Sequence, residues 1–260
     1  FCKNKPALVL TVEIENSQDE TKEYQFETGL RNYLRSSHSY RVYKHSRSTI
    51  NNGDIFIYYE FPGLDSAQVF VANVGARPDY INNNGTILSE DEKSRNHVSQ
   101  CIYKKRLKPG ESMNIIQIIG SAKPKESEST VNYLKKNYNR EINQYNRSIL
   151  QKIRPGILRT GYDHIDHSLA YAYSVIEANA HYLDGEIVPM PCPVEYNFYF
   201  THDALVTDLA AVKFDPERVK EDLEFIIRHA NEDNIIPHAY YWKDEDYVTE
   251  YAGKDNWNNF

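Results

Sequence analysis

The sequence predicts an α+β protein in which an antiparallel β-sandwich domain, over residues 1–122, is followed by helices. In the first part, short β-branched or aromatic runs alternate with polar turns rich in Gly, Pro, Asn and Asp, which is typical of antiparallel sheets. From Val131 onwards, apolar residues recur every three or four positions, as one face of a helix requires. We interpret the polar segment between the two patterns, residues 120–130, as a hinge.

The β part contains four runs with the character of strands. Residues 6–15 alternate, with Leu10, Val12 and Ile14 on the face expected to be buried. The other three runs are short and apolar, at residues 55–59, 69–74 and 115–119. Turns are expected where Asn, Gly and Pro cluster, at residues 51–54, 82–85 and 108–111. These strands account for only part of a sandwich domain.

Two long helices are predicted next. The first lies in a linker region of residues 123–160 and ends before Pro155-Gly156. Its apolar face is Val131, Leu134, Tyr138, Ile142, Tyr145 and Ile149. The second covers residues 164–183, and Gly185 fits the position that follows its last turn.

A helical hairpin is predicted after an aromatic segment. Thr201 is expected to cap the third helix by accepting a bond from a first-turn amide, and Asp203 then lies in that turn, where the helix dipole favours a negative charge. Asp215, followed by Pro216, is the expected N-cap of the fourth helix. The predicted apolar stripes are Ala204, Leu205, Leu209 and Val212 on the third helix and Val219, Leu223, Ile226 and Ala230 on the fourth.

The aromatic stretch that ends in Phe200-Thr201-His202-Asp203, followed after the hairpin by Asn234-Ile235-Ile236-Pro237-His238, resembles the six-hairpin glycosidase superfamily. This superfamily includes glycogen-debranching enzymes, glucoamylase-like enzymes and disaccharide phosphorylases. Its members have Arg-Asp before the hairpin and a G-x-I-P-H turn after it, so His202 and Asn234 depart from the pattern. The resemblance implies that residues 161–260 are the N-terminal part of an (α/α)6 catalytic barrel, or toroid, which is incomplete in this chain.

The resemblance also implies a glycosidase that acts on α-glucosidic linkages, in the manner of glycogen-debranching or glucoamylase-like enzymes and with inversion. Five residues are the substrate-binding candidates that it points to: Asp203, His202, Phe200, His238 and Trp257. Asp203 would hold sugar hydroxyls, although a first-turn carboxylate can equally serve only its helix. His238 and Trp257 also have structural alternatives, as a loop-orienting histidine and a buried anchor.

Glycoside hydrolysis needs two carboxyl groups that flank the scissile bond. The carboxylates near aromatic segments are Glu195, Asp203, Glu250 and Asp255, and the last two lie in an acidic run of the kind that is usually solvated. The resemblance places the general acid and base beyond Phe260, so the catalytic residues are unknown and this chain alone is expected to be inactive. A disaccharide phosphorylase and a non-catalytic glycan-binding protein are the alternatives.

Composition and residue spacing exclude several other classes of function. The net charge of -7 argues against a nucleic-acid partner, and no apolar run is long enough to predict a membrane span. His164 and His167 are three residues apart, but no third ligand stands at a suitable spacing, so no metal site and no cofactor are expected. The expected partner is an oligosaccharide or polysaccharide substrate. Compartment and oligomeric state are left open.

Overall fold

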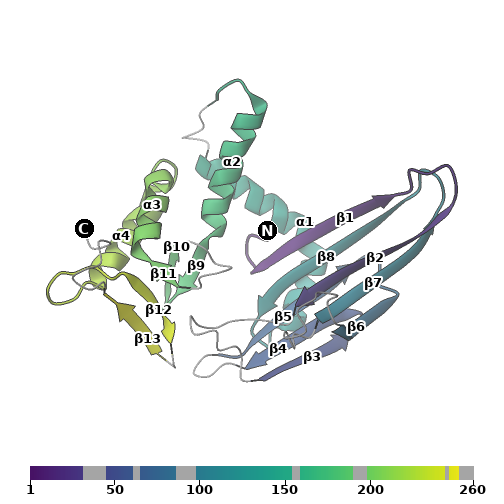
Figure 1. The fold of residues 1–260 in the computed structure, drawn as a ribbon, viewed down its shortest axis with the longest axis horizontal. Helices are drawn as coiled ribbons and strands as arrows, with labels where there is room; N and C mark the ends of the chain where they lie inside the picture. The colour runs from purple at the N-terminus through teal and green to yellow at the C-terminus, as the bar shows by residue number, and fades with distance from the viewer. Residues whose placement is uncertain are drawn as a thin grey trace, which may run out of the picture. The chain divides into compact units, whose positions relative to one another are not determined.

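The computed structural model describes residues 1–31, 45–60, 65–85, 98–153, 159–189, 198–243 and 246–251. The chain divides into two compact units, of which one holds the N-terminal strands and helix α1 as far as Tyr145, and the other begins at Asn146. The elements of each unit are labelled in Figure 1. The predicted fold class, antiparallel sheets followed by helices, is confirmed. None of the described helices is long and apolar enough to cross a membrane.

The first unit is a sandwich of two antiparallel sheets (Figure 1). The larger sheet has the strand order β1 (Ala7–Glu15), β8 (Ser112–Ala122), β5 (Ala67–Val74), β4 (Asp54–Glu60) and β3 (His45–Asn51). The smaller sheet has the order β2 (Lys22–Arg31), β7 (Val98–Leu107) and β6 (Tyr80–Gly85). Buried side chains of both sheets meet in one core, among them Ile55 and Tyr59 from β4 and Tyr103 and Leu107 from β7.

Helix α1 (Ser127–Ile153) covers the other face of the larger sheet with its N-terminal half. Val131 and Leu134 are fully buried there against Phe56, Phe70 and other sheet residues, as the predicted apolar face of this helix requires. An ion pair reinforces the contact, because Lys135 Nζ lies 2.6 Å from the buried Asp54 carboxylate.

The predicted turns have two different outcomes. Asn52 and Gly53 form the β3–β4 turn with positive φ angles of 52° and 82°, as two-residue hairpins require. Residues 82–85, which were expected to be a turn, instead belong to the edge strand β6. The register of β6 on β7 is irregular between Asn82 and Gly85, and an irregular edge strand accommodates residues that are rare in regular strands.

The second unit combines helices with short strands. Its elements are α2 (Asp163–Ala178), β9 (Ala180–Leu183), β10 (Glu186–Pro189), β11 (Tyr199–Phe200), α3 (Thr201–Ala211), α4 (Pro216–Arg228), β12 (Ala239–Lys243) and β13 (Asp246–Glu250). Strands β11, β12 and β13 form one antiparallel sheet, and β9 and β10 form a hairpin. Tyr199 and Tyr240, on one face of the three-stranded sheet, pack against Phe225 of α4. Asp215 caps α4 as predicted, since its side chain accepts a bond from the amide of Arg218.

The prediction of one helix over residues 164–183 is wrong at its C-terminal end. Helix α2 stops at Ala178, and the residues that follow form the β9–β10 hairpin. Asp184 and Gly185 make its turn with φ angles of 48° and 87°. Gly185 therefore serves a hairpin and not a helix end, and Asp-Gly is itself a strong hairpin signal.

The predicted apolar stripe of α3 is correct for Ala204 and Leu205, which pack in the core, and wrong for Leu209 and Val212. The residues that α3 buries are Thr201, Ala204, Asp208 and Ala211, whereas Leu209 is 74% exposed and Val212 is 43% exposed. On α4, Val219 and Ile226 are buried as predicted, but Leu223 is 43% exposed. The contact face of this hairpin is thus built from small, aromatic and charged residues as much as from aliphatic ones.

Gly120 of β8 should not tolerate a side chain. A Cβ atom at this position would lie 2.7 Å from Ala7 Cβ, Phe70 Cζ and the Pro6 carbonyl oxygen, which is too close for any of them. We expect Gly120→Ala to reduce the free energy of unfolding by about 1–3 kcal/mol, the usual cost of overpacking. Urea denaturation measures this. Ser121→Ala, at the next position of β8, is the control and should change stability by less than about 0.5 kcal/mol; equal effects would contradict the steric explanation.

Candidate functional site

Thr201 joins the two segments that carry the predicted site residues. Its buried hydroxyl donates to the carbonyl of Pro237 at 2.6 Å, and its amide donates to the carbonyl of His238 at 3.2 Å. The prediction that the Thr201 hydroxyl caps α3 is wrong, because this hydroxyl makes no capping bond. The residue instead holds the start of α3 against the segment that enters β12.

The turn before Pro237 explains one departure from the family pattern. The Asn231 side-chain oxygen accepts bonds from the amides of Asp233 and Ile235, at 3.0 and 2.8 Å. Asn234 follows in the left-handed region with φ of 59°, a conformation that Gly adopts freely and that Asn tolerates better than most residues. Asn234 therefore provides the backbone geometry for which the family uses Gly.

The three-stranded sheet has an aromatic face on the side opposite Tyr199 and Tyr240. Residues directly opposite in an antiparallel pair point to the same side, and Phe200, Ala239 and Glu250 form such a row. The Phe198 ring centroid lies 4.3 Å from that of Phe200 and 5.5 Å from that of Tyr241. We call Phe198, Phe200 and Tyr241 the aromatic face; Phe198 and Tyr241 are buried, and Phe200 is half-buried at its border.

His238 and Glu250 border the aromatic face. The rings of Phe200 and His238 meet edge to face, with centroids 5.4 Å apart, and the amide of His238 donates to the Glu250 carbonyl at 2.7 Å. The Tyr241 hydroxyl donates to the Glu250 carboxylate at 3.3 Å. Burial and the nearby negative charge of Glu250 raise the pKa of Tyr241, so Tyr241 stays a neutral donor that orients this carboxylate.

The structure thus brings some of the predicted residues together. Phe200 and His238 are partly buried and in contact. His202 and Asp203 follow directly in the first turn of α3, where both are exposed. Trp257 lies outside the described residues, as do Glu195 and Asp255.

The sequence interpretation missed Tyr241 as part of this surface, whereas Glu250 is exposed, as its place in an acidic run predicted. Most of residues 236–242 lie in strand β12, which pairs with β13. A signal was present, because two short runs with strong β propensity, at residues 239–243 and 246–250, are separated by only two residues. Their alternation places Tyr241 and Glu250 on the same face.

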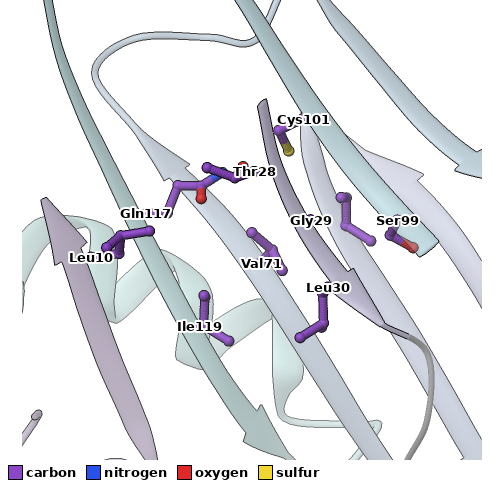
Figure 2. A pocket seen from close by; sticks show the side chains of 10 residues that line it. Leu10, Thr28, Gly29, Leu30, Val71, Ser99, Cys101, Gln117 and Ile119 are labelled. Atoms are coloured by element: carbon purple, nitrogen blue, oxygen red, sulfur yellow. The ribbon is translucent and has the colours of Figure 1, made fainter. Parts of the chain in front are cut away.

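A separate pocket lies between the two sheets of the sandwich (Figure 2). Its volume is about 190 Å³. Its walls are mostly aliphatic, with a few small polar groups: Leu10, Leu30, Ile55, Val71, Ile119, Thr28, Gly29, Ser99, Cys101 and Gln117. The lining residues include no aromatic ring and no carboxylate. These are the groups that suit a sugar best, so this pocket is a poorer candidate for sugar than the aromatic face.

No family model and no curated protein matches the chain. Twenty-five chains of solved structures match it. One is a presumptive kojibiose phosphorylase from human microbiome, with a TM-score of 0.53 and 12% sequence identity over 90% of this chain and 33% of that chain. The present chain therefore spans about a third of that protein's length. The likeness shows the fold and agrees with the predicted architecture of a sandwich followed by helices. It gives no support to the narrower glycogen-debranching or glucoamylase-like assignment.

Removal of the Thr201 hydroxyl should separate the two segments of the site. Thr201→Val leaves the buried Pro237 carbonyl without its donor, which should reduce the free energy of unfolding by about 1–3 kcal/mol. Thr201→Ser keeps the hydroxyl and is the matched control. Urea denaturation measures stability, and hydrogen exchange should show faster opening around residues 199–201. Equal stabilities of the Val and Ser variants would contradict the role of this bond.

Proposed function

We propose that this chain is part of a carbohydrate-active enzyme that cleaves α-glucosidic linkages, and that the aromatic face and the first turn of α3 together bind the sugar. The observation that carries the proposal is the tie made by Thr201, which sets Phe200 and His238 beside the start of the helix that bears His202 and Asp203. A few fixed polar groups beside aromatic walls suit a sugar. The fold likeness to a presumptive kojibiose phosphorylase supports the same class of substrate.

Each group has a distinct role in this proposal. The half-buried ring of Phe200 offers an apolar surface to the C–H groups of a sugar ring. The Asp203 carboxylate accepts hydrogen bonds from sugar hydroxyls. His202 has at most two ring donors, whereas the Arg that the family has at this position has five, so the sugar is held by fewer bonds from this side. Glu250, oriented by Tyr241, provides a second carboxylate at the border of the aromatic face.

Either water or inorganic phosphate could accept the glucosyl group that is released from the cleaved linkage. Hydrolysis by water is the first candidate, as the resemblance implies. Phosphorolysis is the second, and the likeness to a presumptive phosphorylase favours it. Phosphate binding needs cationic or amide donors close to the scissile bond, whereas the polar side chains shown to border the aromatic face are His238 and the Glu250 carboxylate. This chemistry keeps hydrolysis as the first candidate.

Asp203→Asn in the intact protein should lower kcat/KM for an α-glucoside about 10- to 100-fold, because a hydrogen bond to a charged group contributes about 1.5–3 kcal/mol. Asp163→Asn is the matched control, since Asp163 is likewise an exposed first-turn carboxylate, on α2. Steady-state kinetics provides the measurement, and thermal unfolding checks that both variants fold. If the two variants lose equal stability and neither loses activity, Asp203 serves only its helix.

The acceptor is identified by the products. With α-linked glucose disaccharides and the intact protein, hydrolysis should release free glucose at a rate that does not depend on inorganic phosphate. Formation of glucose 1-phosphate, only when phosphate is added, would assign the second candidate instead. Binding of the disaccharide in calorimetry without either product would contradict an enzyme and indicate a glycan-binding protein.

A further inference from the structure

Two carboxyl groups that the proposed sugar site does not use face each other inside the helical hairpin. Asp208 belongs to the buried face of α3 and Asp222 to the buried face of α4. They are only 5% and 1% exposed. Asp203, by contrast, lies on the exposed side of the first turn of α3. The pair is therefore a feature of the hairpin interior.

These carboxyl groups lack donors. Among the described residues, no amide, hydroxyl or cationic group forms a hydrogen bond with any of the four carboxyl oxygens of Asp208 and Asp222. Two ionised carboxylates without donors would be very costly in such a place. A proton on one carboxyl group removes one charge and supplies the missing donor, since its O–H can then bond to the other carboxylate.

The charged and titratable neighbours do not replace that proton. Arg218 of α4 is buried, but its guanidinium is bound to the Glu177 carboxylate and the Ile176 carbonyl of α2, at 3.4 and 3.2 Å. The single positive charge of Arg218 is thus shared among the carboxyl groups of Glu177, Asp208 and Asp222. From β11, the buried Tyr199 hydroxyl lies beside Asp222, and burial together with that acid raises the pKa of Tyr199, so the phenol stays neutral.

The pKa values support a protonated pair. Burial, and then the neighbouring Asp208 carboxyl group, raise the pKa of Asp222 from 3.8 to about 8, against the opposing effects of Tyr199 and Arg218. Burial also raises the pKa of Asp208, while the bond from Asp222 and the charge of Arg218 act in the opposite direction. At neutral pH, Asp222 is accordingly the proton carrier and Asp208 the acceptor.

We propose that a proton shared by Asp208 and Asp222 latches α3 to α4, and that loss of this proton loosens the hairpin that carries the first turn of α3. The latch needs no ligand, because the proton is supplied by the solvent. It makes this hairpin sensitive to pH independently of any substrate.

The direction of the pH effect follows from the two states of Asp222. The unfolded chain releases this proton near pH 3.8, whereas the folded chain keeps it until about pH 8. The stabilisation is therefore complete below about pH 4, declines as the pH rises, and is lost as the pH passes through 8. Above that pH the two ionised carboxylates repel each other in the hairpin interior.

Asp222→Asn tests the latch, because an amide can donate to Asp208 without titrating. Between pH 5 and pH 9, the Tm of the wild-type protein should fall relative to that of Asp222→Asn by on the order of 5–10 °C. Glu221→Gln removes an exposed carboxylate from the same helix and should follow the wild type. A difference between wild type and Asp222→Asn that does not change with pH would overturn the proposal.

Infrared spectroscopy gives a readout that does not depend on the variants folding. The wild-type protein should show the C=O band of a protonated carboxylic acid at pH 7, and the band should disappear as the pH passes through about 8. Absence of the band at pH 7 would overturn the proposal. So would a rise in the wild-type Tm on addition of Ca²⁺ or Mg²⁺ at pH 7, because the carboxylates would then hold a cation where we place a proton.

Discussion

Two hydrogen bonds from Thr201 hold together the parts of the chain on which the candidate site depends. Its hydroxyl and amide bind the carbonyls of Pro237 and His238, so the start of α3 and the entry of β12 cannot move separately. This tie also sets the register of the short strand β11 on β12, since Phe200 pairs with Ala239. The Thr201 hydroxyl supplies a hydrogen-bond donor to the buried Pro237 carbonyl, and a buried carbonyl without a donor is costly.

The aromatic residues at positions 198–200 and 240–241 divide between the two faces of the three-stranded sheet. Tyr199 and Tyr240 turn towards Phe225 and form the core of the unit, and Tyr240 also donates to Asp184 in the β9–β10 turn. Phe198, Phe200 and Tyr241 occupy the other face. The tyrosines of this sheet therefore serve packing in part, and the residues of the second face are the ones that the proposed sugar site uses. Strand alternation, which is a purely local property, decides which aromatic residue has which role.

Local sequence signals predicted the elements that depend on local chemistry. The apolar core strands, the buried face of α1 and the Asp215 cap all follow from composition and spacing. The β9–β10 and β12–β13 hairpins were missed because their strands are only four or five residues long. The orientation of α3 could not be predicted from apolar periodicity, because its buried face carries Asp208 and its exposed side carries Leu209. Only the partner residues on α4 reveal why an acid is buried there.

The two departures from the six-hairpin pattern differ in kind. Asn234 adopts a left-handed conformation, which Gly adopts freely and Asn tolerates better than most residues, so Asn fits the turn that leads to Pro237. His202 has no such substitute role, because its side chain is exposed beside Asp203 and the backbone of α3 does not depend on it. An imidazole cannot form the paired bonds of a guanidinium. If the proposed sugar site is correct, position 202 and not position 234 is therefore where a difference in the accepted sugar would arise.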